Sequence, residues 1–397
     1  MIVLYVVQSF YPATIYGGPI FSIHYACQAL ARRGIYVRVA TTNANGIKKL
    51  DVQPREPVVL EPNYIVTYYD DTLINRFSWD FTRHLARDIR ASELVHLQDV
   101  FSTYAAWTLF LACFYRRPVV LSPRGVFSAW ALSSRRKFLK NLWLTVLVHP
   151  FVGNRSRVCF HATSEQERED IQLLFPHHRI TVVPNAIDCA AFDATPAMSR
   201  LDFFHRFFPD CAVSPINAVV ALAMGRLHSV KGFDIAIRSV SRLVAGYPNL
   251  VLLIAGSDEG EGEELGRLID ELGLTGNIAL VGEVRNLEKL EFLRGGDIFL
   301  FPSHSENFGL ACLEALAAGL PVVASCHTPW SAVESNGAGR FANNTPNSFA
   351  TAIAELLASD LTSMRDAARR LARRFDLSAV AEKFDKFYQE LINAQRT

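Results

Sequence analysis

Residues Asp297–Ser325 read DIFLFPSHSENFGLACLEALAAGLPVVAS, and this stretch decides the fold of the second half of the chain. Its apolar run at 298–302 predicts a buried strand, and a polar loop follows. A helix is predicted from about Gly309 to Ala318 and a second strand at 322–325, with Gly319 as the stop signal of the helix. A strand, a loop, a helix and a strand in this order are typical of a parallel α/β sheet.

The loop and the helix carry two acidic residues, Glu306 and Glu314, in the spacing E-x7-E. The residues that lead from the loop into the helix are Asn307, Phe308, Gly309 and Leu310. A helix start exposes unpaired backbone N–H groups, which suit the phosphates of a ligand. Glu306 is expected at the mouth of the loop, whereas Glu314 lies among apolar helix residues, where an unpaired acid is costly. We interpret the segment as a nucleotide-sugar site; the alternative is a loop carboxylate and an ordinary helix-surface carboxylate.

A second cluster of charge lies in the segment Gly225–Gly232, which is predicted to follow a strand and open a helix. Arg226 and Lys231 place two cations where a diphosphate leaving group would develop charge, and such stabilisation lowers a reaction barrier. The alternative is two solvated surface cations. Cations are disfavoured at a helix N-terminus unless an anion is nearby, which favours the functional interpretation.

Apolar runs alternate with helical patterns along the whole chain, which predicts two doubly wound parallel α/β domains. The strands are expected at 2–7, 36–41, 94–97, 119–122, 158–162, 180–183, 218–224, 251–255, 278–281, 298–302 and 322–325. Helices are expected after the Gly17-Gly18 turn and at 164–174, where Ser164 and Glu167 form a capping box. The domains are predicted as 1–190 and 191–376, joined near 184–195. Gly17 and Gly18 permit close backbone approach to a ligand, although a flexible turn is the alternative.

The chain resembles the retaining glycosyltransferases of family 4, whose fold of two Rossmann-like domains facing across a cleft is called GT-B. The motifs that carry the resemblance follow one another in the family's order: Gly17-Gly18, Thr163-Ser164-Glu165, Val183–Asp188, Gly225-Arg226-Leu227 with Lys231-Gly232, and the E-x7-E block. The resemblance implies that the predicted helix at the C-terminus (377–397) returns to the N-terminal domain.

The resemblance also assigns roles to residues. Arg226 and Lys231 would hold the donor diphosphate without a metal, Glu306 would act beside the transferred sugar, and Glu314 would accept hydrogen bonds from the ribose. The loop from Gly17 would close on the donor phosphates together with the backbone of 307–310. We expect the backbone near Val284 to contact the base. No cofactor and no metal site are expected.

The acceptor side departs from the family pattern. Many members carry His-x-His at one strand end of the first domain and a His at the next, whereas this chain has His96 with Gln98, and then Pro123-Arg124-Gly125. We expect Arg124 and His96 to contact the acceptor or the sugar; a structural role is the alternative for a strand-end histidine. The Pro-Arg-Gly variant looks like a subgroup tied to bacterial surface polysaccharide and lipopolysaccharide synthesis.

Charge is uneven along the chain although the formal net charge is only +1. Residues 100–164 contain no Asp or Glu but nine Arg or Lys. Within them, 134–157 alternates basic and apolar residues, which indicates either a face that docks on an anionic membrane or an ordinary packed helix. The balance gives no case for nucleic-acid binding. Seven scattered cysteines without C-x-x-C predict reduced thiols. The short apolar run at the N-terminus predicts that there is no signal peptide. We therefore expect a cytoplasmic protein, which would be peripheral on the inner membrane face if the docking alternative holds.

Together these features predict a retaining glycosyltransferase that moves a sugar from a UDP- or GDP-sugar to a hydroxyl of a saccharide or lipid-linked acceptor. Two alternatives stay open: a nucleotide-sugar epimerase of the same fold, and a catalytically silent relative that acts as a scaffold. The absence of G-x-G-x-x-G after the first strand counts against a dinucleotide-dependent dehydrogenase.

Overall fold

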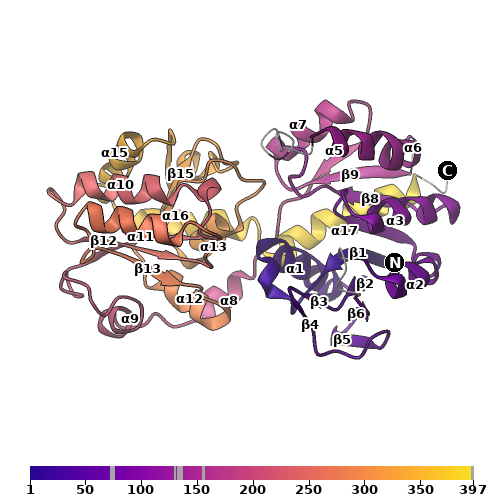
Figure 1. Cartoon of the computed structure of the whole chain (residues 1–397), viewed down its shortest axis with the longest axis horizontal. Coiled ribbons are helices and arrows are strands. Elements are labelled where there is room, and N and C mark those ends of the chain that lie inside the picture. The colour runs from indigo at the N-terminus through magenta and orange to yellow at the C-terminus, as the bar shows by residue number, and fades with distance from the viewer. Residues whose placement is uncertain (72–76, 129–130, 132–136, 154–156, 395–397) are drawn as a thin grey trace. The chain divides into compact units, whose positions relative to one another are not determined.

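The computed structural model describes residues 1–71, 77–128, 131, 137–153 and 157–394. It divides the chain into two compact units. The N-terminal unit contains residues 1–186 and 377–397, and the C-terminal unit contains 187–376. Each unit is an α/β layer structure with its own sheet (Figure 1).

Within the described residues, the N-terminal unit has an eight-stranded sheet in the order β10-β9-β8-β7-β1-β2-β6-β5. Its strands are β1 (Ile2–Ser9), β2 (Tyr36–Thr42), β5 (Pro57–Glu61), β6 (Tyr64–Tyr69), β7 (Leu94–Gln98), β8 (Val119–Ser122), β9 (Val158–Ala162) and β10 (Ile180–Val182). All pairs are parallel except β5 with β6. A small hairpin, β3 (Ala44–Asn45) with β4 (Lys48–Lys49), stands apart. The direction in which strands are added reverses between β1 and β7, which is where such sheets bind ligands.

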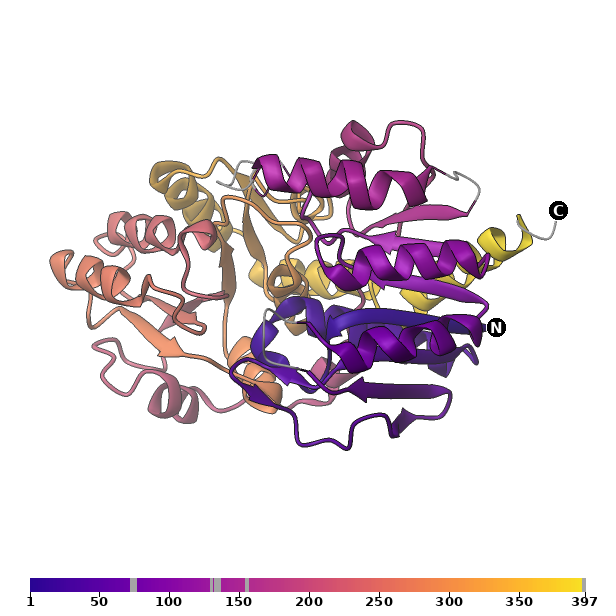
Figure 2. The same cartoon turned by 45° about the vertical axis from the view of Figure 1, so that its right-hand side comes forward.

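The helices of this unit cover both faces of the sheet. One face carries α1 (Gly18–Arg32) and the returning α17 (Leu377–Asn393), which lie side by side in Figure 1. The other face carries α2 (Trp79–Arg90), α3 (Thr103–Phe114), α5 (Lys137–Trp143), the π-helix η2 (Leu144–Val148), α6 (His149–Val152) and α7 (Glu165–Leu174), several of which form the purple layer in Figure 2. A short 3₁₀ turn, η1 (Thr14–Tyr16), precedes α1.

The C-terminal unit has a six-stranded, fully parallel sheet in the order β13-β12-β11-β14-β15-β16. The strands are β11 (Val219–Met224), β12 (Leu250–Ala255), β13 (Ile278–Gly282), β14 (Ile298–Phe301), β15 (Val322–Ser325) and β16 (Gly339–Ala342). Its helices are α8 (Cys189–Ala194), α9 (Arg200–Phe207), the 3₁₀ turn η3 (Ser229–Lys231), α10 (Phe233–Leu243), α11 (Gly262–Glu271), α12 (Asn286–Arg294), α13 (Leu310–Ala318), α14 (Ala332–Ser335), α15 (Pro346–Leu357) and α16 (Leu361–Arg373). Here the strand order reverses between β11 and β14.

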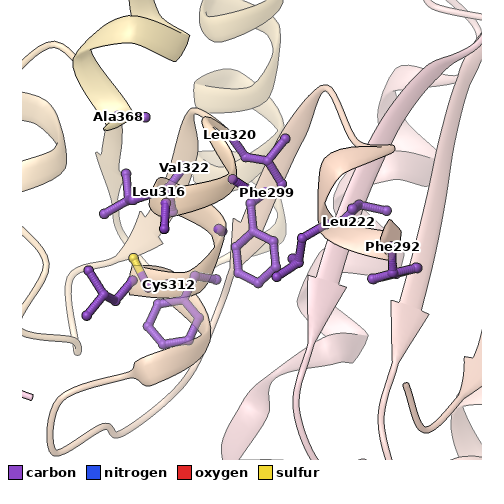
Figure 3. Packing of buried hydrophobic residues seen from close by; sticks show 14 of the residues in the cluster. Leu222, Phe292, Phe299, Cys312, Leu316, Leu320, Val322 and Ala368 are labelled. Carbon is purple, nitrogen blue, oxygen red and sulfur yellow. The ribbon is translucent and has the colours of Figure 1, made fainter. Parts of the chain in front are cut away.

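Each sheet has a hydrophobic core on both of its faces, because successive side chains of a strand point to opposite faces. Val3 and Tyr5 of β1 pack towards α1 and α17, whereas Leu4 and Val6 pack towards α2, α3 and α7. In the C-terminal unit, Leu222 of β11 lies with residues of α12, α13 and α16 (Figure 3). Each sheet is therefore buried on both sides, as parallel sheets require.

The predicted fold class is confirmed: both halves are doubly wound α/β units with parallel sheets. The strands at 119–122, 158–162 and 322–325 have the predicted bounds, and the other predicted strands differ by one or two residues at an end. Ser164 is the N-cap of α7, because its Oγ accepts from the Glu167 N–H at 3.1 Å. The strands β3, β4, β5, β6 and β16 were not predicted.

Candidate functional site

Two loops meet at the carboxyl edge of the C-terminal sheet, one after β11 and one after β14. Because β11 and β14 are neighbours at the point where the strand order reverses, their loops lie together. The His304 N–H donates to the Val230 carbonyl at 2.8 Å, which joins the two loops. Gly232 lies at φ +64°, and a Cβ there would stand 2.3 Å from the Pro302 oxygen, so this close approach requires glycine. The geometry places the Gly225–Gly232 segment against the E-x7-E loop.

Lys231 and Glu306 form an ion pair across these loops. Lys231 Nζ donates to Glu306 Oε1 at 2.5 Å, and the two side chains are 18% and 12% exposed. Ser303 Oγ donates to the same carboxylate oxygen at 3.0 Å. The structure thus brings together two of the predicted site residues, and it holds the carboxylate in one orientation beside a cation.

Arg226 lies on the same loop but pairs with a different partner. Its Nη1 is 2.6 Å from Glu259 Oε2, with the side chains 53% and 38% exposed. Glu259 belongs to the glycine-rich segment 256–262, for which no role was predicted. Exposed ion pairs contribute little stability, so an incoming anion can displace Glu259 from the guanidinium at small cost.

Glu314 is buried in α13 and is paired with Lys289 of α12. Lys289 Nζ donates to Glu314 Oε1 at 2.5 Å, and the side chains are 14% and 7% exposed. Lys289 was not among the predicted site residues. A signal was available, because Phe292 and Leu293, three and four residues later, are fully buried, so Lys289 shares the inward face of its helix.

The start of α13 is held by aromatic packing. Phe308 is buried against Trp330 and Phe375, and Trp330 Nε1 donates to the Phe308 carbonyl at 2.5 Å. Gly309 is the N-cap at φ +82° and no side chain caps the helix, which begins at Leu310. The positive end of this helix therefore has no capping side chain, a condition that suits an anion.

Val284 lies in the turn between β13 and α12. It is buried, and the flanking Glu283 and Arg285 form an exposed ion pair at 2.6 Å. This turn follows the carboxyl end of β13 and leads into α12, the helix that carries Lys289.

In the N-terminal unit, Gly17 lies between η1 and α1, and Gly18 is the first residue of α1; both follow the carboxyl end of β1. Gly17 adopts φ +75° and ψ −148°, which favours glycine, and a Cβ at either residue would meet no atom within 4 Å. The space around this turn is open on the N-terminal unit itself.

His96 is placed in the interior of the N-terminal unit. Its Nδ1 lies 2.6 Å from Tyr388 Oη and its Nε2 lies 2.7 Å from Ser122 Oγ, and the residue is fully buried. Burial lowers the pKa of His96 well below its usual value, with the neighbouring His161 and Arg124 acting in the same direction. This burial does not fit the expected contact with an acceptor, and His96 acts instead as a neutral link between β7, β8 and α17.

Arg124 follows β8 and is half-buried at φ +57°. Its Nε donates to Gln98 Oε1 at 2.7 Å and its Nη1 donates to Asn185 Oδ1 at 2.9 Å. Burial lowers its pKa, whereas the nearby Glu167 carboxylate raises it. Gln98 and Asn185 were not among the predicted site residues.

Among the described residues no group of three or more His, Cys, Asp or Glu side chains is placed to hold a metal ion. None of the helices that the structure describes is long and apolar enough to cross a membrane.

Two family models match the chain. The model described as Glycosyltransferase Family 4 matches residues 16–191, and the model described as Glycosyl transferases group 1 matches residues 213–375. Each half of the chain is therefore similar to a glycosyltransferase domain. The chain is also similar to solved structures, among them Anabaena Alr3699/HepE in complex with UDP and glucose, with a TM-score of 0.71, 18% identity and coverage of 98% of this chain and 100% of that one.

Another similar structure is WaaG, a glycosyltransferase involved in lipopolysaccharide biosynthesis, with a TM-score of 0.66, 17% identity and coverage of 96% and 98% of the two chains. At this level of identity the likeness shows the fold, which is the GT-B fold.

The curated relatives of this chain include proteins named D-inositol 3-phosphate glycosyltransferase. The protein from Acidothermus cellulolyticus is 34% identical over 158 residues, which are 37% of this chain and 33% of the relative. The protein from Kineococcus radiotolerans is 29% identical over 253 residues, which are 58% of this chain and 57% of the relative. The chain spans about a third of the first relative's length and somewhat more than half of the second's. Neither name refers to a surface polysaccharide, so these relatives do not support the subgroup suggested by Pro-Arg-Gly.

Proposed function

We propose that this protein is a retaining glycosyltransferase that moves a sugar from a UDP- or GDP-sugar to an acceptor hydroxyl without a metal. The observation that carries the proposal is the Lys231–Glu306 pair, built from the loops of two adjacent strands at the switch point of the C-terminal sheet. A cation for the diphosphate and a carboxylate for the sugar are thereby held next to each other.

The charges of the site suit a leaving diphosphate. As the bond between the anomeric carbon and the diphosphate oxygen breaks, negative charge grows on the leaving oxygens, and Lys231, Arg226 and the open start of α13 can stabilise it. The electron pair stays with the diphosphate. Glu306 would stabilise positive charge that develops on the sugar ring.

For retention, the acceptor hydroxyl attacks from the face that the diphosphate leaves, and its proton passes to a leaving-group oxygen. Glu314 would accept hydrogen bonds from the ribose beside its ion-pair partner Lys289. Val284 would contribute backbone groups to the base, and the Gly17-Gly18 loop would close on the donor phosphates and help to admit the acceptor.

The comparisons support a UDP-sugar as the first donor to test, because similar structures hold UDP and glucose or UDP-glucose. For the acceptor they offer two directions. The curated relatives are named for D-inositol 3-phosphate, and one similar structure acts in lipopolysaccharide biosynthesis. We propose a saccharide or lipid-linked hydroxyl, with bacterial surface polysaccharide synthesis as the setting, and a cyclitol phosphate as the competing acceptor.

The test is a thermal-shift screen of the purified protein against UDP, GDP, ADP and their sugars, with and without Mg²⁺, followed by turnover assays. A ligand that binds only the native state raises the melting temperature with its concentration. A shift with one nucleotide, unchanged without Mg²⁺, and transfer with retention at the anomeric carbon are expected. A shift without any transfer or hydrolysis would favour a silent scaffold, and interconversion of the free nucleotide sugars would favour an epimerase.

We also propose that the N-terminal unit docks on an anionic membrane through α3, α5 and η2. The elements α3 and α5 each contact η2. Together the three carry these exposed apolar side chains: Trp107, Phe110, Phe114, Phe138, Leu139, Leu142 and Val146. The surrounding segment 100–164 has basic but no acidic residues, which complements an anionic surface. Residues 134–136 and 154–156 of the predicted docking segment lie outside the described residues.

Vesicle flotation tests the docking surface. The protein should float with phosphatidylglycerol vesicles and not with phosphatidylcholine vesicles, and a Phe138→Ser/Leu139→Ser variant should lose flotation while keeping its melting temperature. Equal behaviour of the variant and the parent would show that this face does not bind membrane.

A further inference from the structure

Three side chains meet at the carboxyl edge of the N-terminal sheet, close to its switch point. Gln98 is the last residue of β7 and is in register with Ser122, the last residue of β8; Arg124 follows two residues later. Asn185 comes after β10 and reaches the same guanidinium. In doubly wound sheets ligands bind outside this edge.

The guanidinium of Arg124 donates to neutral partners. Its hydrogen bonds go to amide oxygens, those of Gln98 at 2.7 Å and Asn185 at 2.9 Å. In the part of the chain that the structure describes, no carboxylate lies within 4.0 Å of its nitrogens, and the residues outside that part include no Asp or Glu. A cation withdrawn from water is costly unless an anion compensates it.

The carboxylate that acts on Arg124 from a distance is already occupied. Glu167 Oε1 accepts from the Gly125 N–H at 2.7 Å, and Oε2 accepts from the Thr163 N–H and hydroxyl, each at 2.7 Å. Glu167 therefore shapes the Arg124-Gly125 turn and has no direct contact with the guanidinium.

Gln98 supplies a second, independent sign of a missing ligand. A guanidinium only donates hydrogen bonds, so the amide oxygen of Gln98 must face Arg124 and the amide nitrogen must face away. That Nε2 is buried, in a residue only 3% exposed, and it has no hydrogen-bond partner among the described residues. Buried amide donors are almost always satisfied, which indicates an acceptor atom supplied from outside the chain.

We propose that Arg124 and Gln98 form a subsite for an anionic oxygen group, a phosphate or a carboxylate, carried by the acceptor. The inference rests on the proposed function and adds a substrate class to it. A guanidinium binds such planar or tetrahedral oxyanions through paired N–H groups, and the Gln98 amide adds a neutral donor beside it. A plain hydroxyl would satisfy Gln98 but would leave the charge of Arg124 uncompensated.

The experiment uses the whole chain saturated with UDP and titrates inorganic phosphate, then glycerol 3-phosphate against glycerol, by isothermal titration and thermal shift. The two phosphates should bind and glycerol should not. Arg124→Gln should weaken phosphate binding by about tenfold or more, as expected for the loss of a charge-assisted pair. Arg83→Gln, at an exposed position of α2, is the matched control and should bind as the parent does.

A second variant keeps the test decisive if Arg124→Gln folds poorly. Gln98→Glu has nearly the same shape and places a carboxylate against Arg124, so it should fold at least as stably and should lose phosphate binding. Retained phosphate binding in Gln98→Glu, or no binding to the parent, would overturn the subsite.

The titrations with UDP bound distinguish two possible sources of the anion, the acceptor and the donor diphosphate. Phosphate binding that persists with UDP bound indicates an acceptor group, whereas phosphate displaced by UDP would assign the subsite to the donor diphosphate and overturn the inference. If UDP itself does not bind, the proposed function fails. If UDP binds and sugar is transferred equally well to charged and uncharged acceptors, only the subsite fails.

Discussion

His96 and Tyr388 are separated by 292 residues in the sequence, yet His96 Nδ1 lies 2.6 Å from Tyr388 Oη. The contact fastens the returning helix α17 to β7 in the core of the N-terminal unit. It belongs to a buried chain of hydrogen bonds that crosses the sheet.

The proton positions in this chain of hydrogen bonds follow from the Val183 carbonyl at one of its ends. The Val183 carbonyl can only accept, so His161 Nε2 carries a proton and His161 Nδ1 accepts from Ser122 Oγ, at 2.6 Å. Ser122 then accepts from His96 Nε2, which leaves His96 Nδ1 to accept from Tyr388. Both rings are thereby neutral.

Tyr388→Phe should be the more damaging of two matched substitutions. It removes the donor to His96 Nδ1 and also the acceptor for Tyr5 Oη, which lies 2.7 Å from Tyr388 Oη. Two buried groups lose their partners, and the free energy of unfolding should fall by about 2–4 kcal/mol. Tyr5→Phe removes only one donor from Tyr388 and should cost about 1 kcal/mol. Urea unfolding of both variants measures this difference, and equal losses would contradict the proton assignment.

The same chain makes stability depend on pH. Burial lowers the pKa of His161 to about 3 and that of His96 well below its usual value, so the unfolded state binds more protons than the folded state below pH about 6.5. The stability is fully present above that pH and should fall as the pH drops towards 3, by up to about 1.4 kcal/mol per pH unit for each histidine.

Comparison with a variant isolates this effect from other groups. Asp170, whose pKa burial raises to about 6, acts in the opposite direction, but it is common to parent and variant. Urea unfolding between pH 7.5 and about 5 should show a shallower slope for His161→Gln than for the parent. His177→Gln, at an exposed position, should keep the parental slope.

The sequence predicted those strands whose apolar runs are buried on both faces, because a short uninterrupted apolar run between turn residues is typical of a central parallel strand. The antiparallel pair β5 and β6 was not predicted, because these two strands form a hairpin where an alternation of helix and strand was expected. A signal was present in Pro62-Asn63 between two stretches rich in Val and Tyr, and Asn63 adopts φ +64°. The edge strand β16 is short and carries Gly339 and Arg340, so its pattern was weak.

For the candidate site, the sequence indicated the residues but not their partners. The pairs Lys231–Glu306 and Lys289–Glu314 join segments 75 and 25 residues apart. Which cation meets which carboxylate depends on the order of strands in the sheet, and local patterns do not contain that order. The burial of His96 favours the structural alternative for a related reason, because α17 covers it from the far end of the chain.

Lys231→Ala should lower turnover by about a hundredfold or more, because a positioned cation at developing charge supplies several kcal/mol. Loss of Lys231 also removes the cation from Glu306, whose carboxylate keeps the hydrogen bond from Ser303. Initial rates with saturating donor measure the effect, and circular dichroism checks the fold. Lys383→Ala, at an exposed position of α17, should keep full activity. A folded Lys231→Ala protein with nearly parental turnover would remove Lys231 from the diphosphate site.

Lys289 and Glu314 should be coupled in stability but not in donor binding. Lys289→Met leaves a buried carboxylate without its cation and should destabilise the protein by about 3–5 kcal/mol. Glu314→Gln in the same chain removes that charge, so the double variant should regain most of the stability. Because Glu314 is the predicted ribose ligand, the double variant should still bind UDP at least about tenfold more weakly than the parent. Urea unfolding and UDP titration of the four proteins in this cycle separate the two effects. If the double variant regains both stability and UDP affinity, the pair is a structural contact and Glu314 does not bind the ribose.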